Sequence, residues 1–228
     1  MRRNRIGMDS LNNKPFFCSW SGGKDSCLAL YRAIKAGGIP KILFTMMTEE
    51  GERSRAHGIK LSLLQSQAEA LGIPLAVKNA SWDKYEEVFL SAIKGFKERG
   101  IGYGVFGDID LEGHIQWVER VCSSAGIKAH EPLWKHDRQD LLEEFFSSGF
   151  EAIIIAVKES LLGKDMLGRT LDRPLTNEFK KAGIDASGEE GEYHTLVVDG
   201  PLFSSRIAIQ RNGHISTKGY CFLDVAAG

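Results

Sequence analysis

The sequence lacks most of the marks of a metal, redox, secreted or membrane protein. Its 4 cysteines are scattered singly, and none forms the C-x-x-C pair of a zinc knuckle or redox site. No run of about 18 apolar residues is present to span a bilayer, and the polar residues 1–14 lack the apolar segment of a signal peptide. Scattered single thiols are typical of a reducing compartment. These absences predict a cytoplasmic protein with no membrane-spanning part.

An excess of charge of one sign is also absent. Lysine and arginine number 29 and aspartate and glutamate 30, so the formal net charge is −1. Proteins that bind nucleic acid depend on a basic surface, which releases counterions from the phosphates. The balanced charge therefore argues against nucleic acid as the main partner. The 228 residues suffice for one large domain or two small ones. The sequence does not fix the oligomeric state, although enzymes of this size and class often pair, so a homodimer stays open.

Short apolar runs alternate with longer amphipathic segments over the first half of the chain. Strands are expected at residues 16–20, 41–48, 75–78 and 104–107, and helices at residues 24–36, 59–71, 82–98 and 114–125. This order implies right-handed crossovers and a parallel sheet with helices on both faces. The predicted class is therefore α/β, with a twisted parallel sheet flanked by helices.

The pattern changes near residue 130. A helix over 137–148 and a strand over 152–157 are expected, and an irregular stretch rich in glycine and charge follows at 158–191. Short strands at 193–199, 205–210, 214–218 and 220–224 are expected to be joined by tight turns such as Asn212-Gly213. We therefore expect a flexible tail at 1–14, a first domain at 15–130 and a smaller α+β domain at 131–228.

A glycine-rich loop stands between the first expected strand and the first expected helix. Its members are Ser21, Gly22, Gly23, Lys24, Asp25 and Ser26. Glycines at 22 and 23 can adopt backbone angles that are closed to other residues, and so can turn successive N–H groups toward one anion. The helix that begins here adds its positive N-terminal end. The loop therefore predicts a phosphate-binding site.

The side chains of this loop suit a nucleotide. Lys24 supplies a full positive charge for phosphate, and Ser21 and Ser26 offer hydroxyls, of which Ser26 could also cap the helix. Asp25 would repel phosphate, so we expect it either to meet Mg²⁺ or to cap the helix. The spacing is neither a Walker A motif nor G-x-G-x-x-G.

S-G-G-K-D-S after the first strand of a parallel sheet resembles the PP-loop ATP pyrophosphatase superfamily. The resemblance implies an adenine nucleotide alpha hydrolase-like (HUP) fold, with ATP and Mg²⁺ bound by the domain at 15–130. It also implies the chemistry of the superfamily. A substrate oxygen is adenylated, pyrophosphate leaves, and a nitrogen or sulfur nucleophile then displaces AMP.

Further segments resemble the diphthine–ammonia ligase family over residues 16–209. They are QAEALGIP at 67–74, PLW at 132–134, LGRTLD at 167–172, GEEGEYHT at 188–195 and DGPLF at 199–203. The resemblance implies an ATP-dependent ligase that adenylates a carboxylate and amidates it, with the domain at 131–228 binding that substrate. No glutaminase nucleophile is evident, so free ammonium is the expected nitrogen source.

The acidic loop departs from this family's pattern. The diphthine enzymes tend to read C-G-E-G-G-E-[YF]-E-T, whereas Ser187, Glu190 and His194 stand here in place of Cys, Gly and Glu. The stretch FGDID at 106–110 is more similar to bacterial relatives, some of which have been proposed to act in cobalamin salvage. Two acceptors therefore stay open, namely diphthine on an elongation factor and a small corrinoid.

The resemblance and the strand ends together suggest further site residues. Thr45 and Met46 end the second strand, where backbone in this superfamily contacts adenine. His57 follows in a loop and could donate to phosphate or to the adenylated carboxylate. Asp108, just past the carboxyl end of a strand, could hold Mg²⁺ together with Asp110, whose alternative role is to cap the next helix.

The loop at 188–195 contains several acidic residues whose charges repel one another, which predicts that the loop binds a cation. Either Glu189 or Glu192 could take a proton from ammonium, and His194 follows them in the loop. Arg169 is expected to clamp a phosphate or a substrate carboxylate. The alternative for the loop is a solvated acidic turn before a strand.

Two other function classes compete with a ligase. A sulfur-transferring or tRNA-modifying PP-loop enzyme typically needs a catalytic cysteine pair and a basic face for tRNA, whereas here Cys18 and Cys122 have no evident partner and the overall charge is balanced. A non-catalytic adenine-nucleotide sensor of this fold would lack the S-G-G-K-D-S loop. Lys24 therefore favours catalysis.

Overall fold

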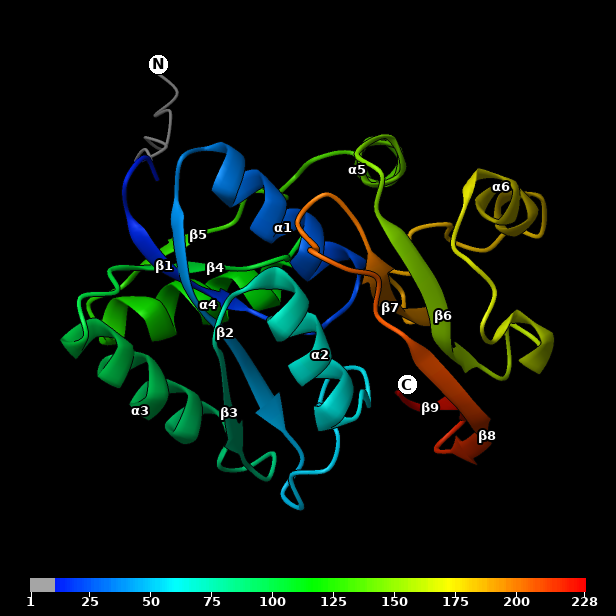
Figure 1. Ribbon diagram of the computed structural model, residues 1–228, viewed down its shortest axis with the longest axis horizontal. Helices are drawn as coiled ribbons and strands as arrows, with labels where there is room; N and C mark the ends of the chain where they lie inside the picture. The colour runs from blue at the N-terminus through cyan, green and yellow to red at the C-terminus, as the bar shows by residue number, and fades with distance from the viewer. Residues whose placement is uncertain (1–10) are drawn as a thin grey trace.

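Two β-sheets with helices packed on them make up residues 11–228, the part of the chain that the computed structural model describes (Figure 1). The first sheet runs in the order β3-β2-β1-β4-β5, and every neighbouring pair is parallel. Its strands are β1 (Pro15–Ser19), β2 (Ile39–Met47), β3 (Leu75–Asn79), β4 (Tyr103–Val105) and β5 (Lys128–His130). The expected parallel α/β sheet is confirmed.

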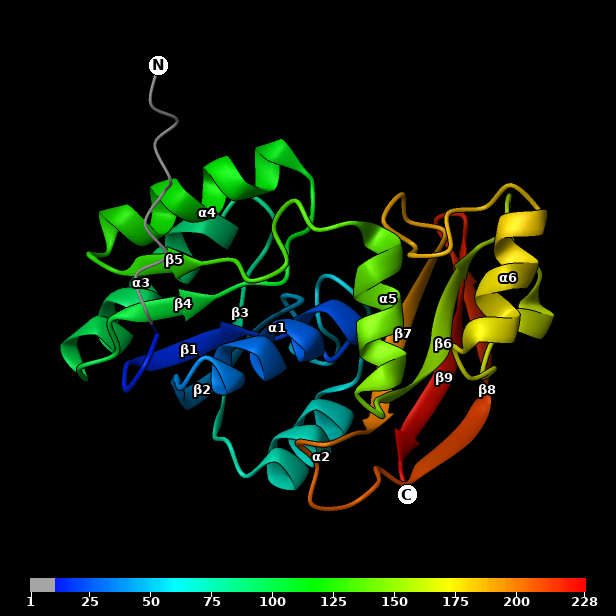
Figure 2. The same cartoon turned by 90° about the horizontal axis from the view of Figure 1, so that it is seen from above.

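Helices cover both faces of this sheet. They are α1 (Lys24–Lys35), α2 (Leu61–Leu71), α3 (Tyr85–Glu98) and α4 (Glu112–Ser124). Figure 2 shows α3 and α4 on one face and α1 and α2 on the other. Successive residues of β1 point to opposite faces. Phe17 packs into one apolar cluster with Phe89 and Phe96 of α3, whereas Phe16 and Cys18 join the cluster around α1.

The second sheet is antiparallel, in the order β7-β6-β9-β8. Its strands are β6 (Glu151–Lys158), β7 (Tyr193–Asp199), β8 (Ile209–Thr217) and β9 (Tyr220–Ala227). Helix α5 (Arg138–Ser147) lies between this sheet and α1, and α6 (Arg173–Lys181) covers the far side (Figure 2). One apolar cluster includes Leu28 of α1, Phe145 of α5 and Ile154 of β6, so the two sheets share a core.

Three details of the second half differ from the expectation. The stretch 158–191 is not irregular throughout, because it contains the 3-10 helix η1 (Lys164–Met166) and α6. The apolar pattern of the sequence does not reveal helix α6, because this helix buries only Leu175, Thr176 and Phe179. The segment Asn212-Gly213 is not a turn. It is a bulge inside the single strand β8, and the turn falls at Lys218 and Gly219, which both have positive φ.

Residues 11–14 of the expected flexible tail are packed against the fold. Of the expected tail at 1–14, residues 1–10 lie outside the described part. Leu11 is buried in the core, and the Asn13 amide donates to the Gly37 carbonyl at 2.9 Å. Within residues 11–228, no helix is both long enough and apolar enough to cross a membrane.

Candidate active site

The loop between β1 and α1 is fixed by contacts from the second half of the chain. Gly22 has φ of +81°, and its carbonyl accepts from the Val197 amide at 2.9 Å and from Gln67 Nε2 at 3.0 Å. A Cβ placed on Gly22 would lie 2.7 Å from Gln67 Oε1. Only glycine therefore satisfies both the angle and the space at this position.

Strand β7 also holds Lys24, and Ser21 of the loop itself holds Gly23. The Lys24 amide donates to Thr195 Oγ1 at 3.1 Å, and the Gly23 amide donates to Ser21 Oγ at 3.3 Å. Two of the amides expected to cradle an anion thus already donate to hydroxyl oxygens. The first-turn amides of Asp25 and Ser26 have no intrahelical acceptor, as in any helix, and they remain donors for a phosphate.

Ser26 does not cap the helix. The N-cap of α1 is Gly23, which has no side-chain capping bond. Instead, Ser26 Oγ donates to the Gly23 carbonyl at 3.1 Å and lies 3.0 Å from Ser21 Oγ. The two hydroxyls tie the ends of the loop together.

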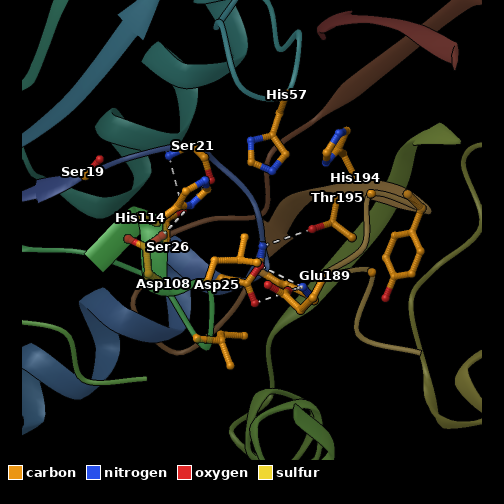
Figure 3. Close-up of a pocket in the computed structure, with 17 residues that line it drawn as sticks. Ser19, Ser21, Asp25, Ser26, His57, Asp108, His114, Glu189, His194 and Thr195 are labelled. Atoms are coloured by element: carbon orange, nitrogen blue, oxygen red, sulfur yellow. Dashed lines mark hydrogen bonds and ion pairs between the residues drawn. The ribbon is translucent and has the colours of Figure 1, made fainter. Parts of the chain in front are cut away.

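A buried lysine between two carboxylates forms the centre of the site. Lys24 Nζ lies 2.8 Å from Asp25 Oδ2 and 3.1 Å from Glu189 Oε1. Only 7% of Lys24 is exposed, so its charge is compensated by these partners rather than by water. Figure 3 shows Asp25 and Glu189 side by side, with His57 and His194 across the pocket. Asp25 thus pairs with Lys24 rather than capping the helix.

Burial and charge shift the pKa values of this ion-paired group in a useful way. Burial alone would lower the pKa of Lys24, but Asp25 and Glu189 outweigh it and raise the value, so the ammonium stays charged. Burial raises the pKa of Glu189 to about 7, against the opposing charge of Lys24, which is shared with Asp25. Glu189 is therefore poised to exchange a proton near neutral pH.

Two neutral histidines lie in contact with each other at one wall of the same pocket. The rings of His57 and His194 lie 4.6 Å apart at an interplanar angle of 76°. Burial, followed by the charge of Lys24, lowers the pKa of His194 to about 4. Burial, His194 and Lys24 lower the pKa of His57 well below its usual value. Neutral imidazoles can donate a hydrogen bond without adding charge, and the buried Nδ1 of His57 has no partner within the described residues.

These residues line one cavity of about 290 Å³. Asp108 enters it from the end of β4, with Oδ1 3.1 Å from His114 Nδ1. A Cβ on Gly107 would lie 2.9 Å from the backbone of Asp25, so this loop packs directly on the first turn of α1. Asp110 caps no helix. It pairs with Arg138 at 2.7 Å.

Asp25 and Asp108 fit the magnesium ion that the sequence suggests. Their side chains are 29% and 22% exposed and open onto the same cavity. Within residues 11–228, no three or more His, Cys, Asp or Glu side chains are grouped to hold a metal. Mg²⁺ typically takes one or two carboxylates and completes its shell with substrate phosphates and water, so two carboxylates suffice.

Asp108→Asn is expected to raise the magnesium concentration needed for half-maximal ATP turnover by about tenfold, because the amide removes one anionic ligand. The measurement is a magnesium titration at fixed ATP. Asp140→Asn, a change at an exposed aspartate on α5, is the matched control and should leave the titration unchanged. An unchanged midpoint in Asp108→Asn would remove this residue from the metal site.

A second cavity of about 90 Å³ adjoins the first and shares Ser19 and Ser21 with it. Its other walls are Trp20, Phe44, Thr45, Met46, Ser54, Arg55, Ala56, Trp82, Tyr85 and Phe89. Thr45 Oγ1 donates to the Trp20 carbonyl at 2.6 Å, which fixes the strand end. Aromatic walls beside a phosphate-binding loop suit a planar base. Thr45 and Met46 line this cavity, and their contact with adenine stays a prediction.

Two expected site residues are not brought to these cavities. Arg169 pairs with Glu178 of α6 at 2.9 Å and does not line this pocket. Glu192 is buried and does not line the pocket, because its carboxylate accepts from the Glu190 amide at 3.0 Å and shapes the acidic loop. Of the two glutamates proposed as the base, only Glu189 reaches the site.

Reasoning from the sequence missed two residues that hold the loop. Thr195 and Gln67 bind its backbone, yet neither has chemistry that singles it out. Both belong to segments that resemble relatives, GEEGEYHT and QAEALGIP. The segment GEEGEYHT ends at Thr195, and the segment QAEALGIP begins at Gln67.

A glycine-rich loop with a buried, ion-paired lysine at the carboxyl edge of a parallel sheet defines a nucleotide enzyme of the PP-loop class. Family models agree over both halves of the chain. The diphthamide synthase N-terminal domain matches residues 16–129, and the diphthamide synthase C-terminal domain matches residues 137–227. The chain belongs to the diphthamide synthase family, which confirms the expected resemblance.

Curated relatives agree with this assignment. Diphthine–ammonia ligase from Homo sapiens is 29% identical over 231 residues, covering 90% of this chain and 86% of that protein. The Danio rerio protein of the same name is 30% identical over 214 residues, covering 83% and 84%. A predicted tRNA methyltransferase subunit from Methanocaldococcus jannaschii aligns at 17% identity and TM-score 0.46, over 82% of this chain and 98% of that one, which is too distant to add to either fold or function.

Proposed function

We propose that this protein adenylates a substrate carboxylate with ATP, releases pyrophosphate, and amidates the carboxylate with ammonia. The observation that carries the proposal is the buried Lys24, held between Asp25 and Glu189 at the start of α1 in a cavity open to solvent. A charged lysine here suits a leaving pyrophosphate, and a carboxylate of near-neutral pKa beside it suits the proton transfer that amidation needs.

In the first step, the adenine of ATP lies in the aromatic cavity beside Thr45 and Met46, and the phosphates extend toward Lys24. Mg²⁺ held by Asp25 and Asp108 would neutralise the phosphate charge. A carboxylate oxygen of the substrate attacks the α-phosphorus, and the bond to the bridging oxygen of pyrophosphate breaks. Lys24 and the first-turn amides of α1 stabilise the charge that develops on the leaving group.

In the second step, the nitrogen of ammonia attacks the carbonyl carbon of the acyl-adenylate. The bond between that carbon and the AMP oxygen breaks, and AMP leaves with the electron pair. Glu189 takes the proton that the nitrogen loses. His57 and His194 are neutral donors within the same cavity and can hydrogen-bond the acyl oxygen as it gains charge.

Diphthine on an elongation factor is the first candidate acceptor, because the relatives are named for it. A small corrinoid is the second candidate acceptor, and the position of one departure from the family pattern in the acidic loop favours it. Of the three departures in the acidic loop, Ser187 is buried against Asp185 and Glu190 is largely exposed, but His194 lines the pocket. The departure that can touch an acceptor is therefore His194.

The testing experiment measures pyrophosphate and AMP released from Mg-ATP and ammonium, with diphthine-bearing elongation factor or cobyric acid added in turn. Release of the two products in equal amounts with only one acceptor would support the ligase and name its substrate. Binding of ATP without pyrophosphate from either acceptor would instead favour a nucleotide sensor.

Glu189→Gln is expected to slow amide formation by about a hundredfold or more, because the amide cannot accept a proton. The base works when ionised. With a pKa of about 7, the wild-type kcat/KM, expressed per concentration of free ammonia so that the titration of ammonium itself is removed, should therefore fall as pH drops below that value. Glu189→Gln should lose this acid limb, and Glu190→Gln at the exposed neighbour should keep it. An acid limb that persists in Glu189→Gln would assign it to another group.

A further inference from the structure

The aromatic cavity beside the glycine-rich loop is too small to enclose a whole purine base. Its volume is about 90 Å³. A cavity of about 150 Å³ is filled by benzene, which is smaller than adenine. Part of an adenine held in this cavity must therefore project from it and lie against the residues at its mouth.

Trp82, in the loop between β3 and α3, stands at this mouth. It lines the cavity, yet 72% of the residue is exposed, more than any other large apolar side chain among the described residues. Its ring lies 5.7 Å from the ring of Tyr85, which in turn stacks at 6.1 Å on the buried Phe89. A row of three aromatic rings thus leads from the floor of the cavity to the surface, and such rings offer flat apolar faces to a planar base.

Arg55 fixes the exposed indole in place. Its guanidinium carbon lies 4.8 Å from the centre of the Trp82 ring, a contact that is favourable for a planar cation. Arg55 Nη2 donates to the Ala80 carbonyl, and the Arg55 amide donates to the Met46 carbonyl at 3.0 Å. These contacts join the loops that follow the parallel neighbours β2 and β3, which end at the same edge of the sheet (Figure 1). The mouth is therefore built from both loops.

Arg55 also carries a buried donor that has no acceptor among the described residues, namely its Nε–H. A buried N–H without an acceptor costs free energy. Two hydroxyls of the same cavity are bonded, since Thr45 Oγ1 donates to the Trp20 carbonyl and Ser54 Oγ accepts from the Ile59 amide. Adenine has ring nitrogens that accept hydrogen bonds, which is the chemistry that Nε lacks.

We propose that Arg55 and Trp82 form the outer wall of the adenine site and hold the part of the base that projects from the cavity. This inference rests on the proposed binding of ATP and concerns the base alone. Both residues line the aromatic cavity and neither lines the larger cavity around Lys24, where the phosphates are placed. Trp82 supplies the apolar face, and Arg55 positions it and supplies a donor.

The first test compares ATP with inorganic pyrophosphate, which has no base, by isothermal titration calorimetry. Arg55→Ala and Trp82→Ala should each raise the Kd for ATP by about tenfold, the usual order for the loss of one stacking partner of a base. Trp82→Phe keeps an aromatic face and should stay within about threefold of wild type. The Kd for pyrophosphate should be unchanged in all three variants, which also shows that they are folded.

The matched control is Trp134→Ala. Trp134 also has a cation over its ring, with Lys135 Nζ at 5.3 Å, but it lines neither cavity. Its removal should leave the Kd for ATP unchanged.

An unchanged Kd for ATP in both Arg55→Ala and Trp82→Ala would overturn the proposed wall while leaving the ligase intact. Weaker pyrophosphate binding in Arg55→Ala would overturn it too, because Arg55 would then act on the phosphates. Failure of wild type to bind ATP would instead contradict the proposed function, on which the inference rests.

A second test measures whether ATP covers the indole. Acrylamide quenches the fluorescence of exposed tryptophans, and the difference in quenching between wild type and Trp82→Phe isolates the contribution of Trp82. ATP should abolish most of this difference, and pyrophosphate should leave it unchanged. A difference that persists at saturating ATP would show that the base does not lie on Trp82, and the proposal would fail.

Discussion

Lys24→Ala is expected to lower acceptor-dependent pyrophosphate release by about a thousandfold, since removing one preorganised charged donor typically costs this order of rate. Lys24 is the cation buried between Asp25 and Glu189 at the point where the leaving group gains charge. Its loss also leaves those two carboxylates facing each other and the phosphates without compensation. The measurement is kcat/KM for ATP in the pyrophosphate-release assay.

The matched control is Arg169→Ala. This change removes a cation and its ion pair with Glu178, but outside the pocket. Exposed pairs contribute little to stability, so activity should change by less than about twofold. A decrease below about tenfold in Lys24→Ala would show that the lysine does not stabilise the leaving group.

Gln67→Leu is expected to destabilise the protein by roughly 2–5 kcal/mol, because it leaves several buried polar groups without a partner. Gln67 is fully buried and donates to the carbonyls of Gly22, at 3.0 Å, and Val197, at 2.7 Å. Its Oε1 accepts from Trp20 Nε1 at 3.0 Å. The Gly22 carbonyl keeps the Val197 amide, whereas the Trp20 indole N–H loses its acceptor.

Urea unfolding measures this effect as a lowered midpoint. Gln65→Leu makes the same substitution at an exposed position two residues away on α2 and should change the free energy of unfolding by less than about 0.5 kcal/mol. Equal stability of the two variants would mean that the buried amide does not join the loop to β7.

The first half of the fold could be predicted from the sequence because its signals are local. Apolar runs that alternate with amphipathic segments give the order of strands and helices, and S-G-G-K-D-S falls where a strand meets a helix. Strand β5 was missed because its three residues, Lys128–His130, are too short to show a period. Helix α6 was missed because most of its surface is polar, although Asp172 caps it and Pro174 lies in its first turn.

The site itself depends on contacts that no local pattern encodes. Lys24 and Thr195 are 171 positions apart in sequence, yet the hydroxyl of one fixes the backbone of the other. Likewise, the choice between Glu189 and Glu192 is made by the fold of the acidic loop, which turns one carboxylate to Lys24 and the other to a backbone amide. The position of Arg169 could not be predicted for the same reason, since its partner Glu178 lies on the helix that the sequence did not reveal.

The proposed adenylation requires that a substrate carboxylate attack ATP, so that the bond between the α-phosphorus and the bridging oxygen of pyrophosphate breaks. The most direct measurement labels the acceptor carboxylate with the heavy isotope of oxygen and follows that label by mass spectrometry after turnover with Mg-ATP and ammonium. Adenylation predicts that one labelled oxygen appears in AMP, because the oxygen that attacks the α-phosphorus leaves with it. Unlabelled AMP, or ADP and phosphate as the products, would contradict the adenylation mechanism.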